Sequence, residues 1–124
     1  MQEQIKKVKE FHDTFKIFQK QSGELRHKLM AEENDEYLEA IQEDDEVGIA
    51  DALGDQLYIL CGTILNHGME GIIEKVFEEI HKSNMSKLDE SGQPIFREDG
   101  KIMKGPTDFE PNIKSILDER YNNG

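Results

Sequence analysis

The feature that most constrains this chain is an apolar stretch over residues 47–65, "VGIADALGDQLYILCGTIL", whose only formally charged side chains are Asp51 and Asp55. Residues four apart share one face of a helix. A buried, isolated charge costs several kcal/mol, whereas like charges four apart on a helix surface cost about 0.2–0.5 kcal/mol. The apolar surroundings favour the larger cost, and therefore a compensating cation beside the two carboxylates.

The hydrophobic pattern predicts an all-α fold. Helical spacing of apolar residues predicts helices over about 3–20, 24–43, 46–67 and 69–84, with Ser22 as an N-cap and Gly68 as the residue after a C-cap. Asp99-Gly100 between two short alternating runs predicts a β-hairpin in an appendage over about residues 86–111. A short terminal helix is expected over about 112–121. The 124 residues suit a single domain, 1–124, built as a four-helix bundle with this small C-terminal hairpin.

The predicted second helix places acidic residues inside an apolar stripe. Glu33 and Glu36 share a face with Leu25, Leu29 and Ala40, and Glu32 and Glu39 flank it. A short turn makes this helix the antiparallel neighbour of the 46–67 helix, which lets four carboxylates meet. Carboxylate-only coordination suits hard ions such as Mg²⁺ or Mn²⁺. The competing interpretation is that "EENDEYLEAIQEDDE" is simply a solvated acidic face.

Composition and charge limit the other possibilities. A net charge of −12 disfavours non-specific nucleic-acid binding, which depends on Lys and Arg. The start "MQEQIKKVKEF" lacks the pattern of a signal peptide, and the two Asp residues in the 47–65 stretch argue against a membrane span. We therefore expect a soluble, cytoplasmic protein. The single cysteine, Cys61, is expected to be an inert core thiol.

A carboxylate metal site suits two chemistries. A di-iron bundle needs Glu-x-x-His motifs on two helices, and the chain contains Glu24…His27 and Glu78…His81. His27, however, points roughly away from Glu33 on the same predicted helix. The second chemistry is phosphoanhydride cleavage, in which metal ions bind phosphate oxygens and activate water.

Three segments resemble the all-α nucleoside triphosphate pyrophosphohydrolases, the MazG and phosphoribosyl-ATP pyrophosphohydrolase-like superfamily. "EENDE" carries an E-x-x-E motif, "DALGDQLY" resembles the second acidic motif, and "SNMSKLDESGQPIFREDGKIMKGP" is similar to the tail of one subgroup. The similarity covers most of residues 8–111. It implies a MazG-like bundle, completed by a homodimer or a dimer of dimers, that hydrolyses an NTP or dNTP to the monophosphate and pyrophosphate in nucleotide-pool house-cleaning.

The resemblance also implies roles for individual residues. Mg²⁺, or Mn²⁺, would be held by Glu33, Glu36, Asp51 and Asp55, with Glu32 accepting a proton from the attacking water. Phosphate and nucleotide contacts would come from Asn84, Lys87 and Lys104, and base or sugar contacts from His12 and Phe15.

The chain departs from the family at the second motif, E-x-x-D. The position three before Asp51 is Gly48, and the position three before Asp55 is Ala52, so the motif Glu is absent in either register. Either Asp51 replaces it with Asp55 as the motif Asp, or Asp51 is the motif Asp and Gly48 has lost a ligand for which Glu32 or Glu39 compensates. This departure motivates a further alternative, a nucleotide- and metal-binding module without turnover.

Overall fold

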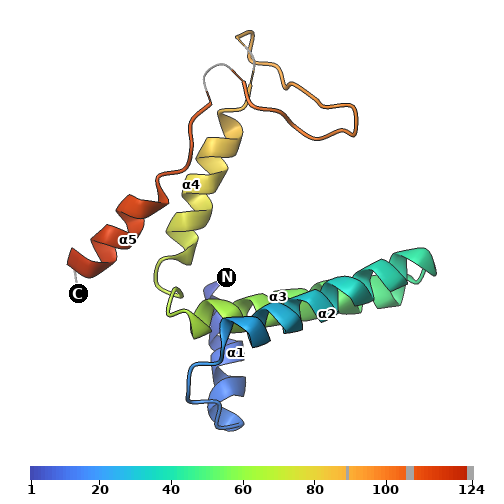
Figure 1. Ribbon diagram of the computed structural model, residues 1–124, viewed down its shortest axis with the longest axis vertical. Coiled ribbons are helices and arrows are strands. Elements are labelled where there is room, and N and C mark those ends of the chain that lie inside the picture. Colours follow the sequence, from blue (N-terminus) through green and yellow to red (C-terminus); the bar gives the residue numbers. More distant parts are fainter. Residues whose placement is uncertain (89, 106–107, 123–124) are drawn as a thin grey trace. The chain divides into compact units, whose positions relative to one another are not determined.

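The computed structural model describes residues 1–88, 90–105 and 108–122, and confirms an all-α protein. Its five helices are α1 (Gln2–Thr14), α2 (Gly23–Gln42), α3 (Glu46–Asn66), α4 (Ile73–Met85) and α5 (Ile113–Asn122) (Figure 1). The chain divides into two compact units, Met1–Glu70 and Gly71–Gly124. The prediction of a single domain over 1–124 is not tested by this division and stays a prediction.

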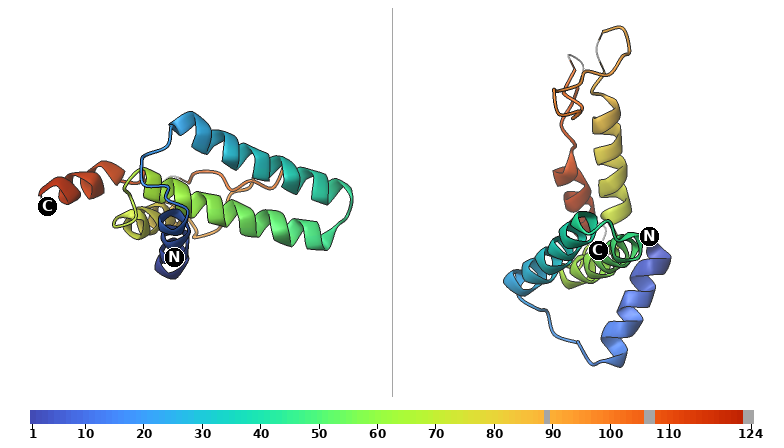
Figure 2. Two further views of the ribbon diagram at one scale, coloured as in Figure 1. Left: turned by 90° about the horizontal axis from the view of Figure 1, so that it is seen from below. Right: turned by 90° about the vertical axis from the view of Figure 1, so that its right-hand side faces the viewer.

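The first unit is a helical hairpin with one helix packed against it. α2 and α3 run side by side in opposite directions, and α1 packs on α3 (Figures 1 and 2). Ile5 and Val8, one turn apart on α1, are buried, as are Cys61 and Ile64 on α3. Full burial of an aliphatic side chain of this size stabilises a fold by about 1.5–3 kcal/mol. The prediction that Cys61 is a core thiol is confirmed, because the residue has 0% exposure.

The first three helices end in the same backbone motif. In α3 the N–H of Met69 donates to the carbonyl of Ile64 at 3.0 Å, and Gly68, with φ of +66°, lies at the left-handed position that was predicted for it. Non-glycine residues occupy this position after the other two helices, Lys16 (φ +60°) after α1 and Asp44 (φ +53°) after α2. A left-handed conformation costs a non-glycine residue roughly 1–2 kcal/mol. Because neither position is a glycine, the glycines in the sequence do not reveal where α1 and α2 end.

The motif at Lys16 corrects the predicted first helix, which was expected to continue to about residue 20. The N–H of Ile17 donates to the carbonyl of His12 at 2.7 Å, and α1 ends at Thr14. The segment that follows is held by Asn66, whose side chain accepts from the N–H of Gln21 at 2.7 Å and donates to its carbonyl at 3.0 Å. Ser22 then caps α2, as predicted, by accepting from the N–H of Leu25 at 3.1 Å.

Arg26 joins three parts of the first unit. The residue is only 6% exposed. Its guanidinium donates to Oε1 of Gln21 at 2.8 Å, to Oγ1 of Thr63 at 3.1 Å and to the carbonyl of Ile59 at 2.9 Å. A side chain at Gly62 would place its Cβ 2.6 Å from Nη2 of Arg26, so the glycine makes room for the guanidinium. Arg26 therefore fixes α2 against α3 and holds the connection from α1.

The turn between α2 and α3 explains why a residue without a side chain, Gly48, lies near the start of the apolar helix. Asp45 caps α3, with its Oδ1 accepting from the N–H of Gly48 at 3.0 Å. A Cβ at Gly48 would lie 2.6 Å from Oδ2 of Asp45 and 3.2 Å from the Cβ of Ala40. A larger residue at position 48 would thus displace the cap that closes this turn.

The apolar helix over 46–67 is not covered on every side within one chain. Val47, Leu53 and Leu60 are 81%, 51% and 40% exposed. Three helices pack together in the first unit, and the four-helix bundle stays a prediction.

The second unit contains α4, α5 and the chain between them. α4 begins at Ile73 rather than near residue 69, because turns occupy residues 70–72. The described residues contain two isolated antiparallel bridges, Leu88–Pro94 and Phe96–Ile102, and the predicted β-hairpin stays a prediction. The N–H of Arg97 donates to the carbonyl of Lys101 at 2.7 Å across the turn. No helix in the described part of the chain has both the length and the hydropathy of a membrane span.

Candidate functional site

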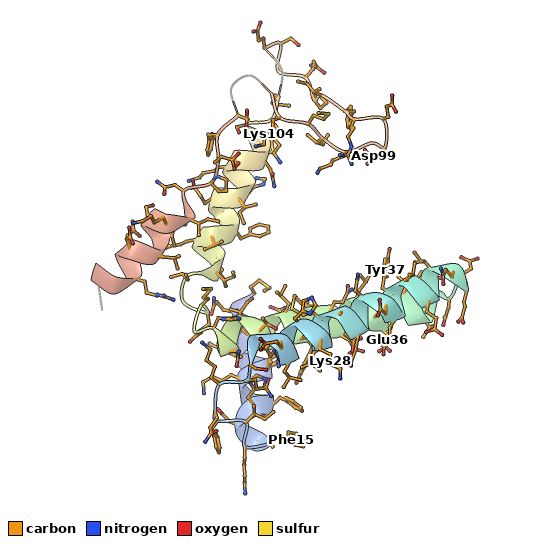
Figure 3. All side chains as sticks on the ribbon, in the orientation of Figure 1. Phe15, Lys28, Glu36, Tyr37, Asp99 and Lys104 are labelled. Carbon is orange, nitrogen blue, oxygen red and sulfur yellow. The ribbon has the colours of Figure 1, made fainter. Side chains whose placement is uncertain are left out.

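Three carboxylates meet where α2 and α3 face each other. Glu33 and Glu36 on α2 and Asp55 on α3 each offer one oxygen, and these oxygens lie within 4.8 Å of one another. Glu36 is exposed, and Glu33 and Asp55 are partly buried. Figure 3 labels Glu36 on α2 beside Tyr37, whose side chain projects in a different direction. The three residues are named below as the acidic cluster.

The acidic cluster surrounds Glu33 with other negative charges. Burial, a hydrogen bond to Glu36, and the charges of Glu36, Asp55 and Asp51 together raise the pKa of Glu33 to about 7. Oε2 of Glu33 is buried without a hydrogen-bond partner among the described residues. A buried carboxylate oxygen left unsatisfied is costly, and a proton or a cation would relieve the cost. These residues therefore fit a hard divalent ion such as Mg²⁺ or Mn²⁺.

The position of Asp55 bears on the missing motif Glu. Asp51 is exposed and lies outside the acidic cluster, although its charge contributes to the raised pKa of Glu33. Ala52 is only 2% exposed, and Gly48, in the first turn of α3, leaves no room for a side chain beside the capping Asp45. Asp55 thus joins the two glutamates of the first motif, and the register of the second motif stays a prediction. Glu32 is exposed on α2 and also lies outside the acidic cluster.

A row of aromatic rings begins one turn beyond Asp55. The ring of Tyr58 meets that of Phe11 edge-on with centroids 5.7 Å apart, and Phe11 contacts Phe15 at 4.7 Å. Phe15, a predicted substrate contact, is 65% exposed near the end of α1 (Figure 3). Sequence reasoning did not single out Phe11, because its helical spacing resembles that of a core residue.

His12, the other predicted contact on α1, is partly buried. Burial, followed by the positive charge of Arg26, lowers its pKa below the ordinary histidine value. His12 is therefore a neutral hydrogen-bonding group near neutral pH.

The remaining predicted contacts belong to the second unit. Asn84 is exposed and Lys87 is partly buried. Nζ of Lys104 lies 2.5 Å from Oε1 of Glu110, and this pairing raises the pKa of Lys104. An exposed ion pair of this kind contributes at most about 1 kcal/mol, so Lys104 can exchange Glu110 for another anion at low cost.

Two comparisons with known proteins found pyrophosphohydrolases. The profile of the PRA-PH family, described as phosphoribosyl-ATP pyrophosphohydrolase, matches residues 1–84. The crystal structure of a candidate NTP pyrophosphohydrolase from Exiguobacterium sp. 255-15 is similar, with a TM-score of 0.57 and 29% sequence identity. The similarity covers 78% of this chain but only 62% of that protein's chain. No curated protein matches significantly.

Proposed function

Because the chain belongs to the phosphoribosyl-ATP pyrophosphohydrolase family, we propose that it hydrolyses the α–β phosphoanhydride of a nucleoside or deoxynucleoside triphosphate. Water oxygen forms a bond to the α-phosphorus, the bond to the bridging oxygen breaks, and the products are the monophosphate and pyrophosphate. The observation that carries this proposal is the acidic cluster with its unpartnered Glu33 oxygen. Removal of non-standard or excess nucleotides is the role we expect for such an activity.

In this proposal, some of the carboxylates bind the metal ion and another accepts a proton. Glu33, Glu36 and Asp55 would hold Mg²⁺, or Mn²⁺, with Asp51 as a further acidic ligand. A bound divalent ion supplies charge neutralisation for phosphate oxygens and a water of lowered pKa. Glu32, which is exposed and outside the acidic cluster, is free to accept the proton that the attacking water loses.

The nucleotide itself needs contacts beyond the acidic cluster. The exposed ring of Phe15 and the neutral imidazole of His12 would contact the base or the sugar. Lys87 and Lys104 stay predicted phosphate contacts and Asn84 a predicted nucleotide contact, and their support is the family resemblance.

Two alternatives make different predictions. A binding module without turnover is favoured by the missing Glu at Gly48 and Ala52. A di-iron oxidoreductase requires histidine ligands, and in the described part of the chain the acidic cluster contains none. His27 instead lines a groove with Asn34 and Gln56.

The test is to incubate the protein with Mg²⁺ and each common NTP and dNTP, and with phosphoribosyl-ATP, while assaying pyrophosphate separately from phosphate. Glu36→Gln should abolish pyrophosphate release, and Asp35→Asn, an exposed acid on the same helix, should not. Mg²⁺-dependent nucleotide binding without pyrophosphate would instead establish the binding module. Iron-dependent absorbance in the visible region would support the di-iron alternative.

A homodimer or a dimer of dimers is also implied by the resemblance. The exposed apolar residues of α3 support association, because they would be covered in an oligomer.

A further inference from the structure

A backbone contact in the second unit brings two lysines from distant positions to the same place. Lys87 comes two residues after the end of α4, and Lys104 lies further along the connection to α5 (Figure 3). The buried Gly105 packs against Leu88 so closely that an added Cβ would overlap the carbonyl of Leu88. Each lysine is the neighbour of one partner in this contact, so the fold gathers two positive charges beside the C-terminal end of α4.

The carboxylate of Glu110 lies at these two charges. Its Oε1 is 2.5 Å from Nζ of Lys104. The hydrogen bond and the charge of Lys104, and then the charge of Lys87, lower the pKa of Glu110 below the ordinary glutamate value. The charge of Asp108 acts on Lys104 as well. Glu110 therefore occupies, with its single negative charge, a position that is attractive to anions.

Hydrogen bonds to α4 hold the backbone on both sides of Glu110. The N–H of Phe109 donates to Oγ of Ser86 at 3.1 Å, and its carbonyl accepts from Oγ of the buried Ser83 at 2.5 Å. Two residues after Glu110, the N–H of Asn112 donates to a glutamate side chain of α4 at 3.0 Å. The backbone thus presents the Glu110 side chain to the lysines, and its position does not depend on the ion pair itself.

A carboxylate and a phosphate group offer the same kind of acceptor to a pair of lysines. Both present anionic oxygens, and a phosphate group carries up to two negative charges where a carboxylate carries one. The side chains of Lys104 and Glu110 are 62% and 75% exposed. An exposed ion pair changes an equilibrium constant by at most about fivefold. A phosphate group can therefore replace Glu110 at small cost.

From these contacts we propose that Glu110 stands in for a phosphate group: it neutralises Lys87 and Lys104 in the free protein, and the phosphates of the ligand displace it. This inference rests on the proposed function, which expects phosphate contacts at the two lysines, and adds a competitor that the chain itself supplies. Because Glu110 returns to the lysines when the phosphates leave, it weakens the retention of pyrophosphate, the proposed product.

The competing interpretation is that Lys104 and Glu110 form an ordinary surface ion pair. The second unit offers a matched control, since Lys75 of α4 and Glu119 of α5 form another exposed pair, with Nζ 3.8 Å from Oε2. Glu119→Gln removes the same charge and the same type of pair as Glu110→Gln. A general effect of net charge on anion binding would therefore be equal in the two variants.

The experiment measures the Kd of inorganic pyrophosphate by titration calorimetry, with a chelator present so that no divalent ion contributes. Glu110→Gln should bind pyrophosphate about three- to fivefold more tightly than the wild type, and Glu119→Gln should stay within about twofold of it. Adding Lys104→Gln to Glu110→Gln should remove the gain. An unchanged Kd in Glu110→Gln, an equal gain in Glu119→Gln, a gain that survives Lys104→Gln, or no pyrophosphate binding at all would each overturn the inference.

A chemical footprint locates the bound pyrophosphate. In Glu110→Gln, pyrophosphate should slow the acetylation of Lys87 and Lys104 by acetic anhydride and leave that of Lys75 unchanged, as mapped by mass spectrometry. Protection of Lys75, or none of Lys104, would contradict the inference.

Neither measurement uses turnover, so the two proposals fail separately. Pyrophosphate release from a nucleotide together with an unchanged Kd in Glu110→Gln would keep the proposed function and remove the role of Glu110. Tighter pyrophosphate binding by Glu110→Gln without any turnover by the wild type would keep the role of Glu110 and remove the hydrolysis.

Discussion

Glu33 of α2 and Asp55 of α3 lie across the helical hairpin from each other, with a carboxylate oxygen of each within 4.8 Å of the other. Bringing two like charges this close is unfavourable unless a proton or a cation is shared between them. The short turn at residues 43–45 and the Arg26 hydrogen bonds hold the two helices together against that repulsion.

The first prediction concerns metal binding and stability. Mg²⁺ or Mn²⁺ should raise the Tm of the wild type, because a ligand that binds only the folded state stabilises it by about 2.7 kcal/mol at a hundred times its Kd. Asp55→Asn should lose most of this gain in a thermal melt, and Asp35→Asn should keep it. An equal gain in both variants would show that the ion binds elsewhere.

The second prediction concerns the pH dependence of the metal-free protein. The pKa of Glu33 is about 7 in the folded state, above the 4.5 of an ordinary glutamate, so the folded protein holds a proton that the unfolded chain releases. This contribution to stability is fully present below about pH 4.5 and is lost as pH rises through 7. Urea unfolding with a chelator present should therefore show a decline in stability between these values that is shallower in Glu33→Gln. A decline of the same steepness in that variant would contradict the assignment, and Glu43→Gln provides the matched control.

The third prediction concerns Arg26. Arg26→Met removes three hydrogen bonds from a residue that is 6% exposed, and leaves the carbonyl of Ile59 without the guanidinium donor. The free energy of unfolding should fall by about 2–4 kcal/mol, since a buried network is disrupted. Lys28→Met, on an exposed position of the same helix, should change it by less than about 0.5 kcal/mol. Similar unfolding midpoints for the two variants would show that Arg26 does not join α2 to α3 as described.

The fourth prediction concerns the left-handed residues. Asp44→Gly should stabilise the protein by up to about 1 kcal/mol, because φ of +53° strains an aspartate and suits glycine. The opposite effect is expected for Asp35→Gly inside α2, which should cost about 1 kcal/mol. Denaturant midpoints measure both changes, and a destabilised Asp44→Gly would mean that the aspartate side chain contributes more than its backbone strain costs.

The parts of the fold that were predictable follow from periodicity. The extents of α2 and α3, the Ser22 cap and the Gly68 terminus are all set by local spacing and local hydrogen bonds. The end of α1 was not predictable, because Lys16 adopts a conformation that its side chain does not favour. The apolar pattern of α3 indicated burial correctly for Cys61, but it does not show that Leu53 would be half-exposed in one chain, since periodicity does not reveal which faces other helices cover.

The candidate site also has features that could be predicted from the sequence and features that could not. Spacing on each helix and a short turn were enough to expect Glu33, Glu36 and Asp55 near one another. The separation of Asp51 from this group depends on how α3 is rotated against α2, which packing decides and spacing does not. The contact of Tyr58 with Phe11 joins positions far apart in the sequence, and no local pattern indicates it.

The measurement that tests the central claim most directly is ³¹P NMR of a nucleoside triphosphate incubated with the protein and Mg²⁺ in ¹⁸O-water. The account predicts pyrophosphate and a monophosphate that carries the ¹⁸O label, with neither product formed by Glu36→Gln. Label in the pyrophosphate, release of orthophosphate and a diphosphate, or undiminished turnover by Glu36→Gln would contradict it.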